Sequence, residues 1–203
     1  QCLHQLDVMQ WILGMPAKVR SEVGIGKYHD IEVEDDVTCY MEYPNGASGV
    51  FITSTGETPG SNRFEIAGTK GRLLLENDKL VFTENTVPSD EWSKTSKVGF
   101  QQPETTVEEI AISPPEDPHS ILITNFVDAI LDGVDLIASG ESGIGSVELA
   151  NVMLFSGLID ETIELPMDGA AWEAKLNDLI ANSTHEKEVV EISTEDFTAS
   201  FRR

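Results

Sequence analysis

A histidine near the start of the chain is the first residue whose type and surroundings could do chemistry. His4 and Asp7 are three residues apart, so on a helix they lie on one face. An imidazole can carry a proton near neutral pH, and a carboxylate beside it can orient the ring. From the spacing alone, a histidine packed against Trp11 in the core is the simpler interpretation, and proton transfer is the alternative.

A second group of polar residues borders a loop rich in Gly and Pro between two predicted strands. Glu57, Asn62 and Arg63 lie there, and loops at strand ends commonly contact ligands. The Arg63 guanidinium could hold a substrate hydroxyl or carboxylate. The alternative is that Arg63 pairs with the acidic residues that are plentiful nearby. His29 and His119 are further candidates of the same kind.

Two glycine runs and one acidic run predict neither a nucleotide site nor a metal site. A dinucleotide fingerprint needs a strand, then Gly-x-Gly-x-x-Gly, then a helix. Residues 24–26 lie between strands and residues 140–145 follow a helix, so we interpret both runs as turns. The consecutive carboxylates of Glu34, Asp35 and Asp36 point in different directions, which favours a solvated surface.

The composition excludes several classes of partner. The 203 residues include 36 acidic and 13 basic side chains, which gives a formal net charge of −23. This acidity disfavours nucleic acids and anionic membranes. A hydrophobic share of 40% is typical of a folded domain. With two cysteines, no visible signal peptide and no apolar run of membrane length, we expect a cytoplasmic protein.

The elements that must position these residues run from a helix through a block of strands to further helices. Apolar residues at helical spacing predict a helix over residues 3–13, which Gly14 and Pro16 end. Alternation and turn residues predict strands at 19–23, 36–43, 47–54, 62–67, 72–76, 80–83 and 107–112, with residues 85–106 irregular. Helices are predicted after the Asp117-Pro118 cap, over 147–159, and around 172–180.

This order of elements predicts an α+β fold with a large, mostly antiparallel sheet and helices packed on one face. Connections this short cannot cross over to parallel neighbours, and strands in one block flanked by helices are typical of α+β. We expect Tyr40, Phe51 and several Thr on the second sheet face, which favours a homo-oligomer formed through that face, and a solvated face is the alternative.

The chain opens within a helical pattern and no capping residue precedes it. We therefore expect a fragment whose first helix was cut near its start. We predict one domain over residues 1–183 and an acidic C-terminal tail over 184–203.

Several short motifs, in this order, resemble the second domain of the Gfo/Idh/MocA oxidoreductases, the family of glucose–fructose oxidoreductase and inositol dehydrogenase. They are His4-Gln5-Leu6-Asp7, Trp11, Gly14-Met15-Pro16, Val33-Glu34-Asp35, Asn45-Gly46-Ala47, residues 55–60, Phe64-Glu65-Ile66, residues 68–71, residues 125–133, residues 139–143 and residues 148–151. The resemblance extends over about four-fifths of the chain, roughly to Ser183.

The resemblance implies a parent protein with an N-terminal Rossmann domain, which binds NAD or NADP and carries a catalytic lysine. No cofactor is then expected on this fragment. The family's proton-transferring histidine falls on His4, and its acidic partner would precede Gln1. Cys2 stands where the family has a glycine.

The resemblance also implies the function. The chain is expected to be the C-terminal substrate-binding and oligomerisation domain of an NAD(P)-dependent oxidoreductase that acts on a sugar, a polyol or a related hydroxy compound. His4 is then the catalytic residue, and Asn62, Arg63 and Glu57 bind substrate. The fragment alone is expected to be inactive. The alternatives are a non-catalytic assembly or binding module with the same fold, and an unrelated acidic hydrolase that uses paired carboxylates.

Overall fold

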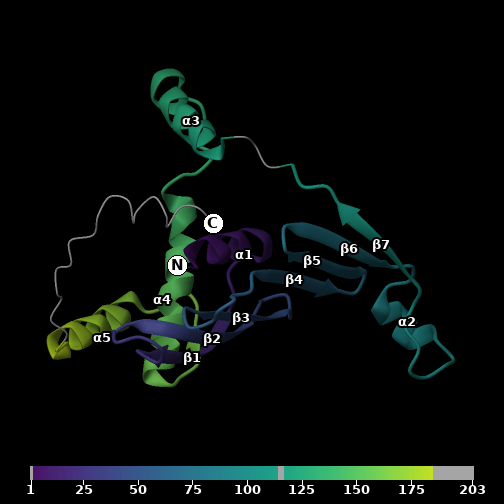
Figure 1. Ribbon diagram of the computed structural model, residues 1–203, viewed down its shortest axis with the longest axis horizontal. Helices are drawn as coiled ribbons and strands as arrows, with labels where there is room; N and C mark the ends of the chain where they lie inside the picture. The colour runs from purple at the N-terminus through teal and green to yellow at the C-terminus, as the bar shows by residue number, and fades with distance from the viewer. Residues whose placement is uncertain (1, 114–116, 185–203) are drawn as a thin grey trace. The chain divides into compact units, whose positions relative to one another are not determined.

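A computed structural model gives the fold of the chain and describes residues 2–113 and 117–184. The chain divides into two compact units (Figure 1). The first unit is Gln1–Gly56 with Gly140–Arg203, and the second unit is Glu57–Ser139. The predicted acidic tail, 184–203, lies outside the described residues except for Thr184.

The first unit is built on an antiparallel four-stranded sheet in the order β3-β2-β1-β8. Its strands are β1 (Lys18–Ile25), β2 (Glu34–Glu42), β3 (Ser48–Ser54) and β8 (Ile163–Glu164). Side chains of β2 alternate between the two faces, as the sequence predicts. Val37, Cys39 and Met41 are buried on one face, whereas Tyr40 is exposed on the other.

Helix α4 covers the buried face of this sheet, and two further helices pack against α4. The three helices are α1 (Leu3–Leu13), α4 (Ile144–Ile159), which follows the short turn η1 (Glu141–Gly143), and α5 (Gly169–Asn182). Helix α4 packs mainly against β1, and α1 packs against α4 (Figure 1). Helix α1 ends where Gly14 takes a φ of 75°, which a glycine adopts readily. The core consists of Leu6, Met9, Val19, Val37, Cys39, Met41, Tyr43, Leu149, Val152, Met153 and Phe155.

Helix α4 approaches β1 closely because its contact residues are small. A Cβ atom on Gly157 would lie 2.8 Å from Val23 Cβ and 3.2 Å from Val23 N. The neighbouring Ser156 is fully buried, and its Oγ accepts a hydrogen bond from Ser21 N at 3.0 Å and donates one to Glu161 O at 2.6 Å. Ser156 thus pairs the Ser21 N–H and the Glu161 carbonyl, whereas the buried Ser21 Oγ has no hydrogen-bond partner among the described residues.

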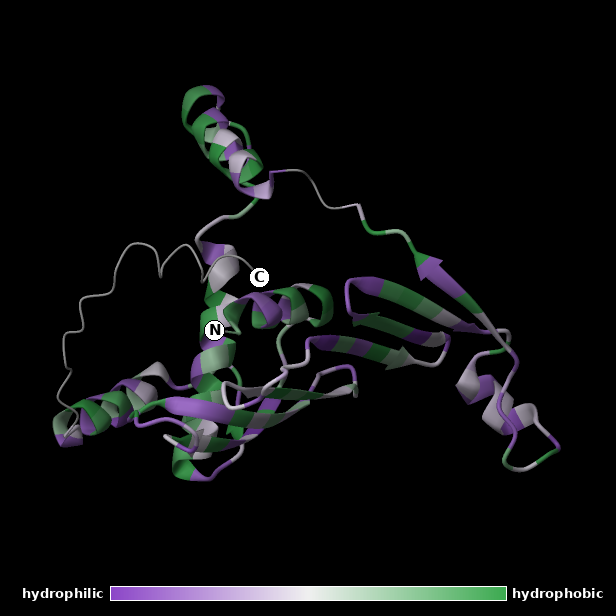
Figure 2. Ribbon diagram, in the orientation of Figure 1, coloured by the Kyte–Doolittle hydropathy of each residue, from purple (hydrophilic) through white to green (hydrophobic). Residues whose placement is uncertain are grey.

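The stretch Glu141–Ile159 is long and apolar enough to cross a membrane, judged by length and composition alone. The expectation that no apolar run reaches membrane length is therefore wrong. Figure 2 shows α4 hydrophobic over most of its length. Six of its residues are buried in the first unit, which is the environment of a core helix.

The second unit contains an antiparallel sheet in the order β4-β5-β6-β7 and two helices. The strands are β4 (Arg63–Gly68), β5 (Gly71–Glu76), β6 (Lys79–Asn85) and β7 (Thr105–Ile110), and the helices are α2 (Ser89–Thr95) and α3 (Pro118–Asp132). Helix α3 begins as predicted, because the Asp117 side chain accepts a hydrogen bond from Ser120 N at 3.1 Å.

The α+β class and the antiparallel strands are confirmed, and three details differ from the expectation. The strands of the described residues form two sheets of four, because pairing stops at Ser54 and restarts after the Gly/Pro-rich residues 55–62. Helix α2 lies in the stretch 85–106 that was expected to be irregular. The short strand β8 was not predicted either.

The prediction that Phe51 lies on the second face of the sheet is wrong. The register pairs Cys39 with Phe51 and Tyr40 with Val50. Paired residues of neighbouring strands lie on the same sheet face, so Phe51 is on the face that the helices cover. The outer face instead carries Tyr40, Val50 and Ile52, which are 46%, 63% and 65% exposed.

We expect Gly157→Ala to destabilise the chain. The added methyl group would overlap Val23 of β1, and overpacking of this kind costs about 1–3 kcal/mol. The gain in helix propensity, about 1 kcal/mol, offsets only part of that cost. Urea unfolding followed by circular dichroism measures the change. Gly169→Ala is the control, because no atom lies within 4 Å of a Cβ there. Equal stabilities for the two variants would contradict the close approach.

Candidate functional site

His4 is the second residue of α1 and is exposed. The apolar neighbours on the same side of α1 are also exposed, with Val8 at 44% and Trp11 at 80%. His4 is therefore not a core histidine packed behind Trp11, which was the simpler interpretation from spacing alone. Its imidazole is open to a ligand or to another part of a larger protein.

Asp7 joins α1 to α4 instead of pairing with His4. Its carboxylate accepts hydrogen bonds from Ser146 Oγ at 2.6 Å and from Gln10 Nε2 at 3.1 Å. These two bonds, the Ser146 bond first, lower the pKa of Asp7, burial opposes them, and the charge of His4 contributes least. Asp7 is therefore a carboxylate at neutral pH that holds the His4 helix on α4 and adds negative potential near the imidazole.

Asp35 organises the loop between β1 and β2. It is 3% exposed, and its carboxylate accepts hydrogen bonds from Lys27 N at 2.9 Å, Tyr28 N at 2.7 Å and His29 N at 3.0 Å. Burial alone would raise its pKa, but these bonds, together with the one from His29 Nδ1, lower the pKa from 3.8 to about 2. The expectation of a solvated acidic surface is thus wrong for Asp35, because the loop folds over its side chain.

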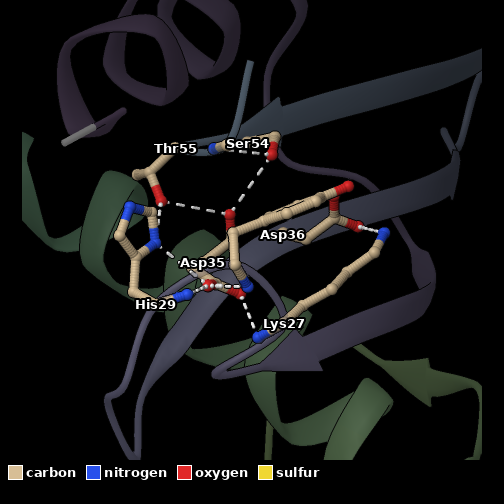
Figure 3. A network of polar contacts seen from close by, with 8 residues as sticks. Lys27, His29, Asp35, Asp36, Ser54 and Thr55 are labelled. Carbon is tan, nitrogen blue, oxygen red and sulfur yellow. Dashed lines mark hydrogen bonds and ion pairs between the residues drawn. The ribbon is translucent and has the colours of Figure 1, made fainter.

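The same loop meets the end of β3 in a small polar network (Figure 3). His29 Nδ1 lies 3.1 Å from Asp35 Oδ2 and 3.3 Å from Thr55 Oγ1, and Thr55 N donates to Asp35 O at 2.9 Å. The Tyr28 ring packs on Gly56, where any side chain would collide with it. Lys27 pairs with Asp36 at 3.1 Å. Both contacts of His29 use one ring nitrogen, so the network is not a relay through the imidazole.

A cavity of about 270 Å³ lies beside this network, within the first unit. Its apolar wall comes from Leu6 of α1, from Val37 and Phe51 of the sheet, and from Met153 and Leu154 of α4. The rest of the lining comes from Cys2, Ile31, Ala150, residues 34–36 and residues 53–55. His4 is absent from the lining, because on α1 it points away from the side that carries Leu6.

The predicted substrate residues Glu57, Asn62 and Arg63 all belong to the second unit, and all three are exposed. Arg63 Nη2 pairs with Glu65, and Arg63 Nη1 lies 3.7 Å from Glu76. Arg72 also reaches Glu65 at 3.6 Å. Arg63 therefore sits in a local ion-pair cluster on one face of the β4–β5 hairpin, and a ligand would have to compete with these carboxylates.

The described residues contain no group of three His, Cys, Asp or Glu side chains that could hold a metal ion. Neither glycine run opens a strand-to-helix phosphate loop. Gly26 lies in the β1–β2 loop with a φ of 55°, and residues 141–143 form the short turn before α4. Burial raises the pKa of Cys39 to about 11, so its thiol stays protonated and is a poor nucleophile.

Sequence reasoning missed the cavity and the Asp35 network. The cavity is formed by residues far apart in the chain, and no local pattern marks it. The sequence did contain one sign of the network, because His29 lies close to three consecutive acidic residues. This closeness does not predict which of the three carboxylates the loop buries.

The fold occurs in known oxidoreductases. The chain is similar to the WlbA dehydrogenase of Bordetella pertussis, solved with NADH and UDP-GlcNAcA, with 18% identity, a TM-score of 0.54, and coverage of 83% of this chain and 44% of that one. It is also similar to the aldose–aldose oxidoreductase of Caulobacter crescentus, solved with glycerol, with 16% identity, a TM-score of 0.60, and coverage of 80% and 45%.

A third solved relative is the UDP-N-acetylglucosamine 3-dehydrogenase GnnA of Acidithiobacillus ferrooxidans. The identity is 18% and the TM-score is 0.59, with coverage of 76% of this chain and 46% of that one. The chain thus spans less than half the length of each of these enzymes. At such identities the likeness establishes the fold alone.

A sequence comparison gives a family match over part of the chain. Residues 1–74 match the family described as the GFO/IDH/MocA C-terminal domain. The predicted resemblance is therefore confirmed, and the matched stretch includes α1 with His4 and the strands β1 to β4. The comparison with curated proteins finds no match.

We expect acid to unfold this protein partly through Asp35. Its pKa is lowered on folding to about 2 from an ordinary 3.8. Its stabilising effect is therefore fully present above about pH 4 and is lost as the pH falls through the interval down to about 2. Asp35→Asn should lower the thermal midpoint at pH 7 and flatten its decline between pH 4 and pH 2.

Asp36→Asn is the matched control for this prediction, because Asp36 sits one residue on and makes an ion pair with the half-exposed Lys27. Surface pairs of this kind contribute little to stability. Thermal unfolding monitored by circular dichroism at a series of pH values measures both variants. Identical pH profiles for Asp35→Asn and the unmodified chain would contradict the role of Asp35.

Proposed function

We propose that this chain is the C-terminal substrate-binding and oligomerisation domain of an NAD(P)-dependent oxidoreductase. Its substrate is a sugar, a polyol or a related hydroxy compound, and the enzyme is cytoplasmic. The observation that carries the proposal is the family match over residues 1–74. The three solved relatives support it, because their names or bound molecules are those of sugar- or polyol-handling oxidoreductases.

In this proposal an N-terminal Rossmann domain of the full-length parent binds NAD or NADP, and the chain by itself binds neither. The solved relatives are about twice as long as the part that this chain matches, which leaves room for such a domain. The nicotinamide supplies the hydride acceptor when it is bound. Oxidation of an alcohol also requires a base within hydrogen-bond reach of the hydroxyl proton.

His4 is the base in this proposal. It is exposed on α1, so a substrate hydroxyl can approach its ring. Asp7 sits one turn on and holds this helix on α4 through the hydrogen bond from Ser146 Oγ. Glu57, Asn62 and Arg63 are the proposed contacts to the other substrate hydroxyls, since all three are exposed polar residues flanking one loop.

The proposed homo-oligomer forms through the outer face of the first unit's sheet, with no nucleic acid or membrane as partner. Tyr40, Val50 and Ile52 form an exposed apolar patch on that face. Apolar patches ringed by polar residues commonly mark protein–protein contacts. The corrected position of Phe51 leaves this argument intact, because Val50 and Ile52 replace it on the outer face.

The first test is His4→Gln in the full-length parent. Loss of a general base typically costs 10²–10⁴-fold in turnover, so we expect kcat to fall at least a hundredfold while NAD(P) binding stays unchanged. Steady-state kinetics and cofactor titration measure the two effects. Gln5→Ala, at the next exposed position of α1, is the control. Unchanged turnover in folded His4→Gln enzyme would favour the alternative, a non-catalytic assembly module.

The second test addresses oligomerisation. Ile52→Glu places a charge in the centre of the outer patch, so we expect it to weaken self-association at least tenfold. Ile180→Glu adds the same charge on α5 at a residue of equal exposure, 64% against 65%. Analytical ultracentrifugation over a concentration series measures the self-association of both variants. If both variants associate like the unmodified chain, the outer sheet face is not the contact surface.

A further inference from the structure

The cavity beneath α1 is a second site, separate from the one proposed around His4. Its lining comes from α1, α4 and strands β2 and β3, all within the first unit. Leu6 lines it, whereas His4 lies on the other side of the same helix and does not. A ligand here would not meet the proposed proton acceptor.

The shape and wall of the cavity fit a small apolar body. Its volume of about 270 Å³ is just below the range of ligand pockets, roughly 300 to 1,000 Å³. A single ring with a short chain fits, and a dinucleotide does not. Leu6, Phe51 and Met153 supply apolar surface from three different elements, so a ring would be enclosed on several sides.

The charged side chains that line the cavity favour a positively charged ligand. Glu34, Asp35 and Asp36 line the cavity, and no basic side chain of the described residues does. Asp35 is satisfied by the loop and His29, and Asp36 is paired with Lys27. The Glu34 side chain has no hydrogen-bond or ion-pair partner in the described part of the chain. One carboxylate is thus left to attract a cation.

We propose that this cavity binds a small amphipathic amine, with its apolar body against Leu6, Phe51 and Met153 and its ammonium group toward Glu34. Anionic ligands of the same size are rejected, because the unpaired carboxylate and the overall charge of −23 repel them. The hydroxyl groups of Thr53 and Ser54, which also line the cavity, can accept hydrogen bonds from the ammonium group.

The test uses three probes of one size and different charge: phenethylamine, 2-phenylethanol and phenylacetate. Each is titrated into the 203-residue chain, and binding is followed by NMR chemical shifts. We expect phenethylamine to bind about tenfold more tightly than 2-phenylethanol, and phenylacetate to bind more weakly than both. Equal affinity for the three probes would overturn the charge selection, and no binding of any probe would overturn the site.

Substitutions in the lining test whether the probes bind in this cavity. Ala150→Leu fills the cavity from α4 and should lower the affinity for phenethylamine at least tenfold. Ala174→Leu, on α5 outside the lining, should leave that affinity unchanged. If Ala150→Leu does not fold, Thr53→Met fills the cavity from the sheet side. Glu34→Gln should remove most of the preference for the amine over the alcohol. Glu22→Gln, on the outer face of the same sheet, is its control. Binding unaffected by either filling variant overturns the proposal.

Discussion

The packing of α4 against β1 is the contact on which the first unit depends. The helix can lie this close to the strand because Gly157 has no side chain and because Ser156 is small. Ser156 also satisfies two backbone groups that the contact would otherwise leave without partners. Since α1 makes its main contact with α4, the position of His4 depends on this packing of α4 against β1.

A second constraint acts through buried charge. Asp35 is an ionised side chain inside the protein, which is costly unless hydrogen bonds replace water. Three successive backbone N–H groups and one imidazole do so. The carboxylate therefore fixes the conformation of the β1–β2 loop, and through Thr55 it fixes the end of β3 as well. Two walls of the cavity are held in place by this one residue.

The sequence predicted those elements whose signals are local. Gly14 and Asp117 mark helix ends, and the alternation of Val37, Cys39 and Met41 identifies the buried face of β2. Each of these signals acts over a few residues and requires no knowledge of the partner element. The family resemblance likewise rested on short motifs kept in one order, and the comparison confirmed it over residues 1–74.

The errors arose where the answer depends on pairing between distant residues. The face of Phe51 follows from the register across the β2–β3 hairpin, and a shift of one residue reverses every side chain of the strand. Helix α2 has seven residues and too few apolar positions for a periodic signal. The burial of Asp35 depends on a loop conformation. Whether Arg63 leaves its carboxylate partners for a substrate is a question of relative affinity, which a sequence does not encode locally.

Strand β3 ends the first unit's sheet, and this has a consequence for how the protein behaves in concentrated solution. Its residues, Ser48–Ser54, carry no charge and no proline, and β-branched or aromatic side chains occupy its centre. In the described residues β3 is an edge strand of its sheet, paired with β2, and an edge strand of that composition can act as a template for intermolecular pairing. The excess of acidic residues opposes such pairing by mutual repulsion between copies. High salt screens this repulsion, so aggregation should begin at a lower protein concentration.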